Sequence, residues 1–326
     1  MILKDFSSSD LKTILHSKRA NLYYLEHCRV MQKDGRVLYL TEARKENQYF
    51  NIPIANTTVL LLGNGTSITQ AAVRMLAQAG VLIGFCGGGG TPLYMGNEIE
   101  WLTPQSEYRP TEYLQRWLGF WFDAEQRLNT AKSLQHMRIE YLRNVWRKDQ
   151  ELKLAGFDLS NHDLTRALNS CQGSIDSAMK TSDLLATEAK LTKQLYKFAA
   201  RLTNVKEFIR EREATDMTNG FLNHGNYLAY GLAASTLWVL GIPHGFAVMH
   251  GKTRRGALVF DVADLIKDAI VLPWAFICAK ENATEQEFRQ QCLQAFTDHK
   301  ALDTMFDRVK TLALQGKEQG LESTPP

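Results

Sequence analysis

The sequence has few cysteines, and none of them are paired in a spacing that binds zinc or builds a disulfide framework. Its 326 residues include only five cysteines, which are scattered along the chain without a Cys-x-x-Cys pair. An odd and scattered set of thiols is typical of a reduced protein in a cytosol. It argues against a zinc finger and against a small domain held by disulfides.

Long apolar runs and a strong charge of one sign are also missing. The apolar stretch 270–278 is far shorter than the roughly 20 residues that cross a bilayer, and the opening residues Met1-Ile-Leu-Lys-Asp5 do not read as a signal peptide. The formal net charge is only +3, so a nucleic-acid surface must come from local arrangement. We expect a globular cytoplasmic protein without a membrane segment.

Strand patterns dominate the first hundred residues. Residues 20–31 and 36–41 flank Asp34-Gly35, which is a strong hairpin signal, and 49–54, 57–62 and 81–86 read as further strands. One helix is expected at 67–79. The glycines at 63, 65 and 87–90 suggest a nucleotide-binding loop, but the third glycine of the dinucleotide motif and the P-loop lysine are absent. Tight turns are the favoured explanation of these glycines.

Helical periodicity follows a linker with two prolines at 103–110. Long helices are expected over 112–147, 161–180, 182–212, 219–240 and 284–315, and the polar tail 315–326 is expected to be disordered. The sequence therefore predicts an α+β protein with a strand-rich domain at 1–102 and an all-α domain at 111–314.

The densest group of chemically active side chains lies between His250 and Lys267. Residues 257–260 are expected to be extended or a buried helical turn, and a helix follows with Asp261 in its first turn. Asp261 and Asp264 are three residues apart, so they share one helix face, where two carboxylates repel unless a cation lies between them. A divalent metal site is one explanation. The alternative is a helix cap, a solvated acid and a hydrogen-bonded core histidine.

A third carboxylate favours the metal. Glu188 falls in line with the apolar positions 184, 191, 195, 198 and 202, where an acid is costly unless it is paired or binds a metal. The polar face of the same helix carries Lys190, Lys193 and Lys197. Such a stripe is usually a solvated face, although positive charge beside an acidic cluster also suits a phosphate polyanion.

The order of these motifs resembles a known family. A helical glutamate, then His-Gly-Lys at 250–252 and Asp-x-x-Asp-x-x-Lys at 261–267, is similar to the integrase and endonuclease family of CRISPR adaptation, which inserts new spacers. The Asn-rich segment 219–231 and the Gly/Pro turn 241–245 agree with this resemblance. The stretches 11–24 and 106–117 resemble the subtype I-F branch.

The resemblance implies a fold and a site. It implies a small amino-terminal β-sandwich before the helical domain, with Glu188, His250 and Asp264 as metal ligands and Asp261 as either a ligand or a partner of one. Carboxylates with one imidazole suit Mg²⁺ or Mn²⁺. Tyr230 matches a tyrosine near the family's active site. The basic residues expected to hold phosphates are Lys252, Arg254, Arg255 and Lys267, whereas Asp268 is expected at the surface.

The resemblance also implies the activity and the partners. The family joins a DNA 3′-hydroxyl to a phosphodiester of the CRISPR repeat, and it acts on prespacer duplexes as a homodimer with the second CRISPR-associated protein. In subtype I-F that partner is fused to the helicase-nuclease. The alternatives are a stand-alone metal-dependent DNA nuclease of repair or recombination, a nonenzymatic DNA-binding scaffold and a nucleotide-binding enzyme.

Overall fold

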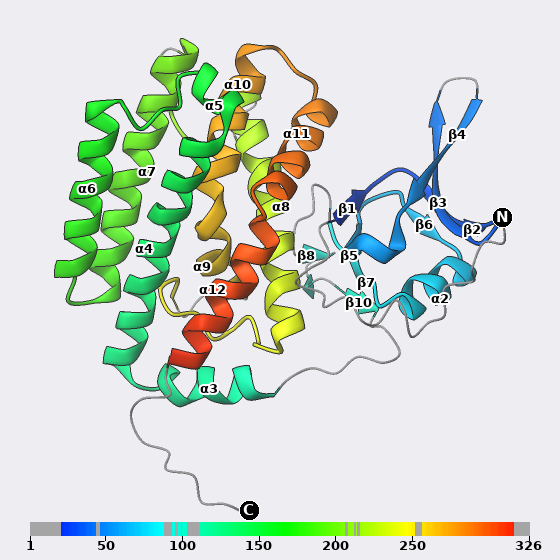
Figure 1. Cartoon of the computed structure of the whole chain (residues 1–326), viewed down its shortest axis with the longest axis horizontal. Coiled ribbons are helices and arrows are strands. Elements are labelled where there is room, and N and C mark those ends of the chain that lie inside the picture. The colour runs from blue at the N-terminus through cyan, green and yellow to red at the C-terminus, as the bar shows by residue number, and fades with distance from the viewer. Residues whose placement is uncertain are drawn as a thin grey trace, which may run out of the picture. The chain divides into compact units, whose positions relative to one another are not determined.

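The structure is a computed structural model in which strands dominate one part of the chain and helices the other. It describes residues 21–43, 46–87, 93–94, 97–98, 100–102, 111–205, 208–211, 213, 216–251 and 256–315. The chain divides into two compact units, Met1–Arg109 and Pro110–Pro326. The first is strand-rich and the second helical, which confirms the predicted α+β class (Figure 1). The predicted linker and the tail from 316 onward lie outside the described residues.

A mostly parallel sheet is built around β5 in the first unit. Its order is β1 (Asn21–Leu25), β5 (Thr57–Leu62), β7 (Leu82–Phe85) and β10 (Glu100–Leu102), and only β10 runs antiparallel to its neighbour. Every residue of β5 is buried, as expected for a central strand covered on both faces. The helix α2 (Gln70–Gln78) connects β5 to β7 and begins after Thr69, whose side chain accepts from Ala72 N.

A second sheet contains the predicted hairpin. Its order is β4 (Glu46–Ile52), β3 (Arg36–Ala43), β2 (Arg29–Lys33) and β6 (Ser67–Ile68), and β8 (Leu93–Tyr94) pairs separately with β9 (Asn97–Glu98). Asp34 and Gly35 both have positive φ, as a two-residue hairpin turn requires. The expectation of one strand over 20–31 is wrong, because the chain turns at His27 with φ 49° and passes from one sheet to the other. Both sheets are small, and they do not clearly form a sandwich.

The glycines after β5 serve close packing. A Cβ at Gly63 would lie 2.4 Å from the Tyr24 hydroxyl, and Gly65 has φ +67° with the His27 ring against it. Only glycine fits both positions without displacing an aromatic or imidazole side chain. These two residues therefore have structural reasons to be glycine that need no nucleotide.

The second unit begins with helices that correspond to the predicted amphipathic segments. They are α3 (Glu112–Trp121), α4 (Ala124–Lys148), α5 (Gln150–Leu154), α6 (His162–Ser177), α7 (Thr181–Thr203) and α8 (Met217–Leu240). The helix α7 ends at Thr203, well before the predicted residue 212, with Asn204 in the left-handed region. Trp117 and Trp146 are fully buried, so these aromatics belong to the core.

The helix α9 (Ala257–Ile266) is largely apolar but carries Asp261 and Asp264. It is followed by a π-helical turn, η4 (Lys267–Val271), and by α10 (Leu272–Lys280), α11 (Glu285–Asp298) and α12 (Ala301–Gln315). The expected helix over 284–315 is two helices, because Lys300 has φ 50°. Nearly all of α9 is buried, and α4 and α8 pack against it. Within the described residues no helix has the length and apolarity to cross a membrane.

Candidate metal centre

The loop that carries His250 is fixed by two tryptophans. The helix α8 ends at Gly241 in the left-handed conformation, and the chain then runs back along α3. Trp117 Nε1 donates to Phe246 O at 3.0 Å, and Trp121 Nε1 donates to Ala247 O at 2.7 Å. The carbonyl groups just before His250 therefore have fixed partners, which restricts where the imidazole can lie.

Asp261 holds the same loop through its amide groups. Its carboxylate accepts from Val248 N at 2.8 Å, Met249 N at 3.1 Å and His250 N at 3.0 Å, and it also faces His250 Nδ1 at 2.7 Å. Because a carboxylate with so many donors acts as an acceptor, the imidazole proton is assigned to Nδ1, and Nε2 keeps its lone pair. Asp261 thus orients His250.

The position of Asp261 in its helix differs from the expectation. The helix α9 begins at Ala257, after Gly256 in the left-handed region, so Asp261 lies in the second turn instead of the first. Its interaction with the backbone amides of a loop replaces the expected interaction with a helix end. The apolar segment 257–260 was too short to identify as helix from its pattern alone.

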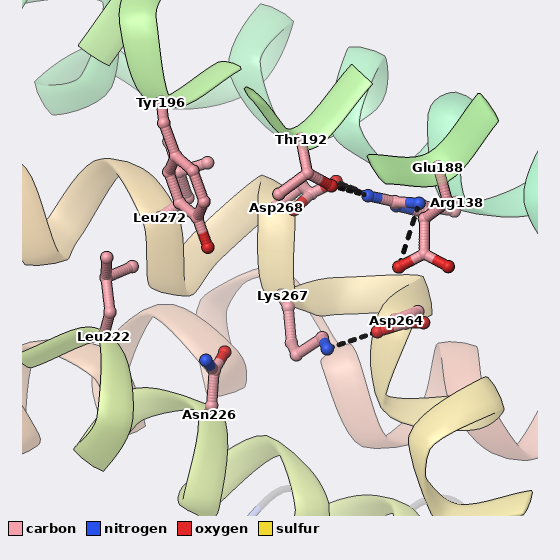
Figure 2. Close-up of a pocket in the computed structure, with 10 residues that line it drawn as sticks. All are labelled: Arg138, Glu188, Thr192, Tyr196, Leu222, Asn226, Asp264, Lys267, Asp268 and Leu272. Carbon is pink, nitrogen blue, oxygen red and sulfur yellow. Dashed lines mark hydrogen bonds and ion pairs between the residues drawn. The ribbon is translucent and has the colours of Figure 1, made fainter. Parts of the chain in front are cut away.

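Three side chains from separate elements converge in front of Asp261. Glu188 of α7, His250 of the loop and Asp264 of α9 each offer one ligand atom, and these atoms lie within 4.8 Å of one another. His250 Nε2 is 3.9 Å from Glu188 Oε2 and 3.9 Å from Asp264 Oδ2. The close-up view shows the Glu188 and Asp264 carboxylates facing each other across a small cavity (Figure 2).

Lys267 and Tyr230 lie beside this cluster. Lys267 Nζ forms an ion pair with Asp264 Oδ1 and lies 5.3 Å from the centre of the Tyr230 ring. The Tyr230 ring packs edge-on against Phe260 of α9. A partly buried cation is thereby held next to the three ligand atoms, in reach of an anion that enters the cavity.

Behind the cluster lies a buried ion pair that sequence reasoning missed. Asp268 was expected at the surface, but its side chain is only 9 % exposed and pairs with Arg138 of α4. From the sequence, Arg138 was assigned no role. The missed signal is its place on the apolar face, because the buried residues Leu134, Leu142 and Val145 share that face.

The charges of this group shift one another's pKa values. Burial and the nearby Asp264 carboxylate raise the pKa of Glu188 to about 7, although Arg138, Lys267 and His250 oppose that shift. Burial would raise the pKa of Asp264, but Lys267 and Arg138 outweigh it and hold that pKa below its usual value. Burial lowers the pKa of His250 less than Asp261 and Asp264 raise it. For Lys267, burial would lower the pKa, but Asp264, Tyr230 and Glu188 together outweigh it and raise that pKa.

The donor set fits a divalent metal ion. Neither oxygen of the buried Asp264 carboxylate has a hydrogen-bond partner among the described residues, and only Oδ1 has the Lys267 ion pair. A buried carboxylate oxygen without a donor is costly unless a cation binds it. Two carboxylates and one imidazole nitrogen are typical ligands for Mn²⁺ or Mg²⁺.

The basic residues expected to contact DNA are not gathered at the cluster. Lys190, Lys193 and Lys197 are exposed along α7, and none of them lines the cavity that contains Glu188 and Asp264. The residues Lys252, Arg254 and Arg255 lie outside the described part of the chain. Of the cations predicted from the sequence, the structure brings Lys267 to the cluster.

The Asn-rich segment of α8 mainly makes internal contacts. Asn219 is buried, donates to Ile209 O and accepts from Arg210 Nη1 at 2.9 Å, while Asn223 Oδ1 accepts from Arg210 Nη2 at 2.6 Å. Asn226 differs, because it lines the cavity opposite Lys267 (Figure 2). Internal hydrogen bonding thus accounts for two of the three asparagines.

A strand-rich unit followed by a helical unit is a fold with solved relatives. A CAS1 protein from Thermotoga maritima gives a TM-score of 0.66 with 16 % identity, over 93 % of this chain and 99 % of that one. A crystal structure of TtCas1 in complex with DNA gives 0.63 with 24 % identity, over 93 % and 94 % of the two chains. A casposase bound to its integration product gives 0.62 with 14 % identity, over 85 % and 81 %.

The sequence itself identifies the family. Residues 22–310 match the family described as CRISPR associated protein Cas1, and the chain belongs to that family. It is 57 % identical over 317 residues to a CRISPR-associated endonuclease Cas1 of Pseudomonas aeruginosa, which covers 95 % of this chain and 98 % of the relative. It is 56 % identical over 314 residues to the Cas1 endonuclease of Pectobacterium atrosepticum, with 94 % and 96 % covered. These matches confirm the predicted family and agree with its subtype I-F branch.

Proposed function

We propose that this chain is a metal-dependent DNA endonuclease and integrase that inserts DNA fragments into a CRISPR array as new spacers. The observation that carries the proposal is the convergence of Glu188, His250 and Asp264, with an Asp264 oxygen that has no donor among the described residues. Family membership and the relatives named as endonucleases support the same chemistry.

The three ligand residues would hold one Mg²⁺ or Mn²⁺. Bound there, the ion would supply Lewis-acid stabilisation of the charge that develops on a scissile phosphate. The ligand atoms are Glu188 Oε2, His250 Nε2 and Asp264 Oδ2. Asp261 is not among them, because its oxygens already accept from the loop amides and from His250. Its role is to keep Nε2 of His250 directed at the cluster, as outer hydrogen-bond partners of metal ligands commonly do.

The other polar groups would act on the DNA strand. Lys267 stays protonated because Asp264 raises its pKa, so it can bind a phosphate oxygen and stabilise negative charge, but it cannot serve as a base. Tyr230 packs beside this ammonium and would contact the strand or the departing oxygen. Lys252, Arg254 and Arg255 follow His250 in sequence and are proposed to hold neighbouring phosphates.

The reaction conserves the number of phosphodiester bonds. The 3′-hydroxyl oxygen of the incoming duplex bonds to a phosphorus of the repeat and loses its proton. The bond between that phosphorus and the departing 3′-oxygen breaks, and the departing oxygen gains a proton. Because one phosphodiester replaces another, no ATP is required.

The proposed partners follow from the family. They are the prespacer duplex and the CRISPR repeat, a second copy of this chain, and the second CRISPR-associated protein, fused in subtype I-F to the helicase-nuclease. TtCas1, a relative of this fold, was crystallised with DNA. The strand-rich unit is proposed to mediate dimerisation and partner contacts, and the helical unit to carry out catalysis.

A stand-alone DNA nuclease is the second candidate. It is favoured by the relatives' description as endonucleases, and the same ligand set would serve if water replaced the attacking hydroxyl. The two functions differ in product, since a nuclease only cuts strands whereas an integrase also joins them.

Strand transfer tests the proposal. A short duplex with free 3′ ends is incubated with a supercoiled repeat-bearing plasmid and the partner protein, in Mn²⁺, Mg²⁺ or chelator. Wild type should join the two DNAs only with metal, and Glu188→Gln and His250→Ala should reduce joining by at least about 10³-fold, since a Lewis acid supplies several kcal/mol of transition-state stabilisation.

Matched substitutions away from the cluster control for nonspecific loss. His136 pairs with Asp176 and Glu140 pairs with Arg308, and both pairs lie at least partly exposed. His136→Ala and Glu140→Gln should therefore keep the wild-type joining rate. Folded Glu188→Gln protein with wild-type joining would refute the metal assignment, and cutting without joining would favour the nuclease.

A further inference from the structure

The guanidinium of Arg138 is surrounded by oxygen atoms. Its Nε donates to Asp268 Oδ2 at 2.8 Å, Nη1 donates to Gln135 Oε1 at 3.0 Å, and Nη2 donates to Thr192 Oγ1 at 2.9 Å and to the same Asp268 oxygen. Arg138 is 3 % exposed. A planar fork with this many partners has one orientation, so its remaining contacts are fixed as well.

One of those remaining contacts is a metal-ligand candidate. Arg138 Nη1 lies 3.8 Å from Glu188 Oε1, while the other oxygen, Oε2, lies 3.9 Å from His250 Nε2. The Glu188 carboxylate is therefore shared, with one oxygen toward the guanidinium and one toward the cluster. The charge of Arg138 attracts Oε1 and so favours this orientation of the carboxylate.

The anchor of this arrangement lies in the π-helical turn. Asp268 belongs to η4, which directly follows α9, the helix that carries Asp264. The same turn is held at a second point, because Trp146 Nε1 donates to Ala269 O at 2.9 Å. Arg138 and Trp146 both belong to α4, so this one helix holds η4 through an ion pair and a hydrogen bond to a backbone carbonyl. π-Helical turns of this kind are frequent at functional sites.

We propose that Arg138 is a positioning residue that turns the Glu188 carboxylate toward the metal, and that Asp268 is the anchor that fixes Arg138. The inference rests on the proposed metal site and adds to it two residues, neither of which touches the ion. Figure 2 shows the sequence of contacts, from Asp268 through the guanidinium to Glu188 and then across the cavity to Asp264.

Replacing Arg138 and Asp268 together tests the positioning of Glu188 without leaving an unpaired buried charge. Arg138 and Asp268 carry opposite charges, so removing both leaves the net charge of this part of the site unchanged. Replacing a buried ion pair by apolar residues of similar size is often neutral for stability, whereas removing one partner leaves an unpaired buried charge. The double variant Arg138→Met/Asp268→Leu is therefore expected to fold and to lose the positioning of Glu188.

The test is Mn²⁺ binding to the full chain without DNA, measured by electron paramagnetic resonance together with the melting temperature of the metal-free protein. We expect Mn²⁺ to bind the double variant about 10- to 100-fold more weakly than wild type, the usual effect of losing an outer partner of a ligand. Arg138→Lys keeps the charge but loses the fork, so it should fold and also bind Mn²⁺ more weakly. Excess Mn²⁺ should restore DNA cleavage to either variant, which a folding defect would not allow.

Arg143→Met is the matched control. Arg143 lies on the same helix, but it donates to Asn169 and Gln172 of α6, away from the cluster. Its Mn²⁺ affinity should equal that of wild type. If Arg138→Met/Asp268→Leu and Arg138→Lys fold and bind Mn²⁺ with wild-type affinity, the positioning role is wrong. The Arg138–Asp268 pair would then only stabilise the fold. If Mn²⁺ bound wild type and Glu188→Gln equally, the metal site itself would be wrong.

Discussion

The two sides of the metal cluster are held by opposite kinds of contact. On the His250 side, Asp261 accepts hydrogen bonds from three loop amides and from the imidazole. On the Glu188 side, the carboxylate approaches the Arg138 guanidinium and the His250 imidazole only at 3.8 and 3.9 Å. The first side is a closed network, and the second is a carboxylate held near charges without a short contact to them.

The comparison explains why two similar aspartates differ. Asp261 and Asp264 are three residues apart on α9, and each is only 2 % exposed. All acceptor capacity of Asp261 faces N–H donors, whereas Asp264 Oδ2 faces no donor among the described residues. Whether a buried aspartate can take a metal is therefore decided by what already occupies its oxygens.

The largest effect is expected from a substitution on the Glu188 side of the cluster. Glu188→Gln should remove detectable Mn²⁺ binding and lower DNA cleavage by about 10³-fold or more. The metal-free protein should be no less stable than wild type, because burial and Asp264 already disfavour the charged form of Glu188. Cleavage assays and thermal melts with chelator check both parts. A marked loss of stability would show that this carboxylate holds the fold.

A substitution on the Asp261 side, where the carboxylate forms a closed hydrogen-bond network, should lower both protein stability and metal binding. Asp261→Asn places an N–H₂ group against N–H donors, and an unsatisfied buried group costs about 2 kcal/mol. The metal-free melting temperature should fall by roughly 5 °C for a unit of this size, and Mn²⁺ should bind about 10- to 100-fold more weakly. A stable Asp261→Asn protein with wild-type affinity would remove the role assigned to Asp261.

The pH dependence of Mn²⁺ binding tests the raised pKa of Glu188. A proton on Glu188 competes with the ion, and its pKa is raised to about 7, so Mn²⁺ should bind about tenfold more tightly at pH 8 than at pH 6. The raised pKa of His250 acts in the same direction. Calorimetric titrations at several pH values measure this, and a flat profile would contradict the raised pKa.

The same pKa has a consequence for the stability of the metal-free protein. The folded pKa of Glu188 is raised above the ordinary value of 4.5. Wild type should therefore lose stability relative to Glu188→Gln as pH rises from about 4.5 to about 7, and the difference should stay constant above that range. Paired chemical denaturation curves test the sign.

The smallest effect on Mn²⁺ affinity is expected at Trp121, which holds the loop before His250. Trp121→Phe removes the donor to Ala247 O, a bond worth about 1 kcal/mol. Mn²⁺ affinity should fall by no more than about fivefold, because Trp117 and Asp261 still hold the loop. Trp274→Phe is the control, since the Trp274 indole N–H has no hydrogen-bond partner among the described residues. A larger loss in Trp121→Phe would mean that α3 controls the loop more than Asp261 does.

Much of the fold could be predicted from local patterns. The Asp34-Gly35 turn and the buried run of β5 indicated strands, and the apolar spacing of α4 and α8 indicated helices. The break at Lys300 and the π-helical turn could not be predicted, because each depends on tertiary contacts such as the Trp146 bond to Ala269. The change of sheet at His27 also lacks a glycine or proline to mark it.

The candidate site shows a similar division. Glu188 stood out because it interrupts an apolar stripe, and the spacing of Asp261 and Asp264 placed both on one face. The sequence left open whether Asp261 was a ligand, since its partners are backbone amides that no side-chain pattern reveals. Arg138 and Asp268 are 130 residues apart, so their pairing requires the folded arrangement of α4 and η4.

A crystal of the full chain soaked in Mn²⁺ tests the central claim most directly. Diffraction data at the manganese absorption edge should show one anomalous peak bonded to Glu188 Oε2, His250 Nε2 and Asp264 Oδ2, with Asp261 still bound to the loop amides. A peak coordinated by Asp261, or an ordered cluster without a peak at a saturating Mn²⁺ concentration, would contradict the account.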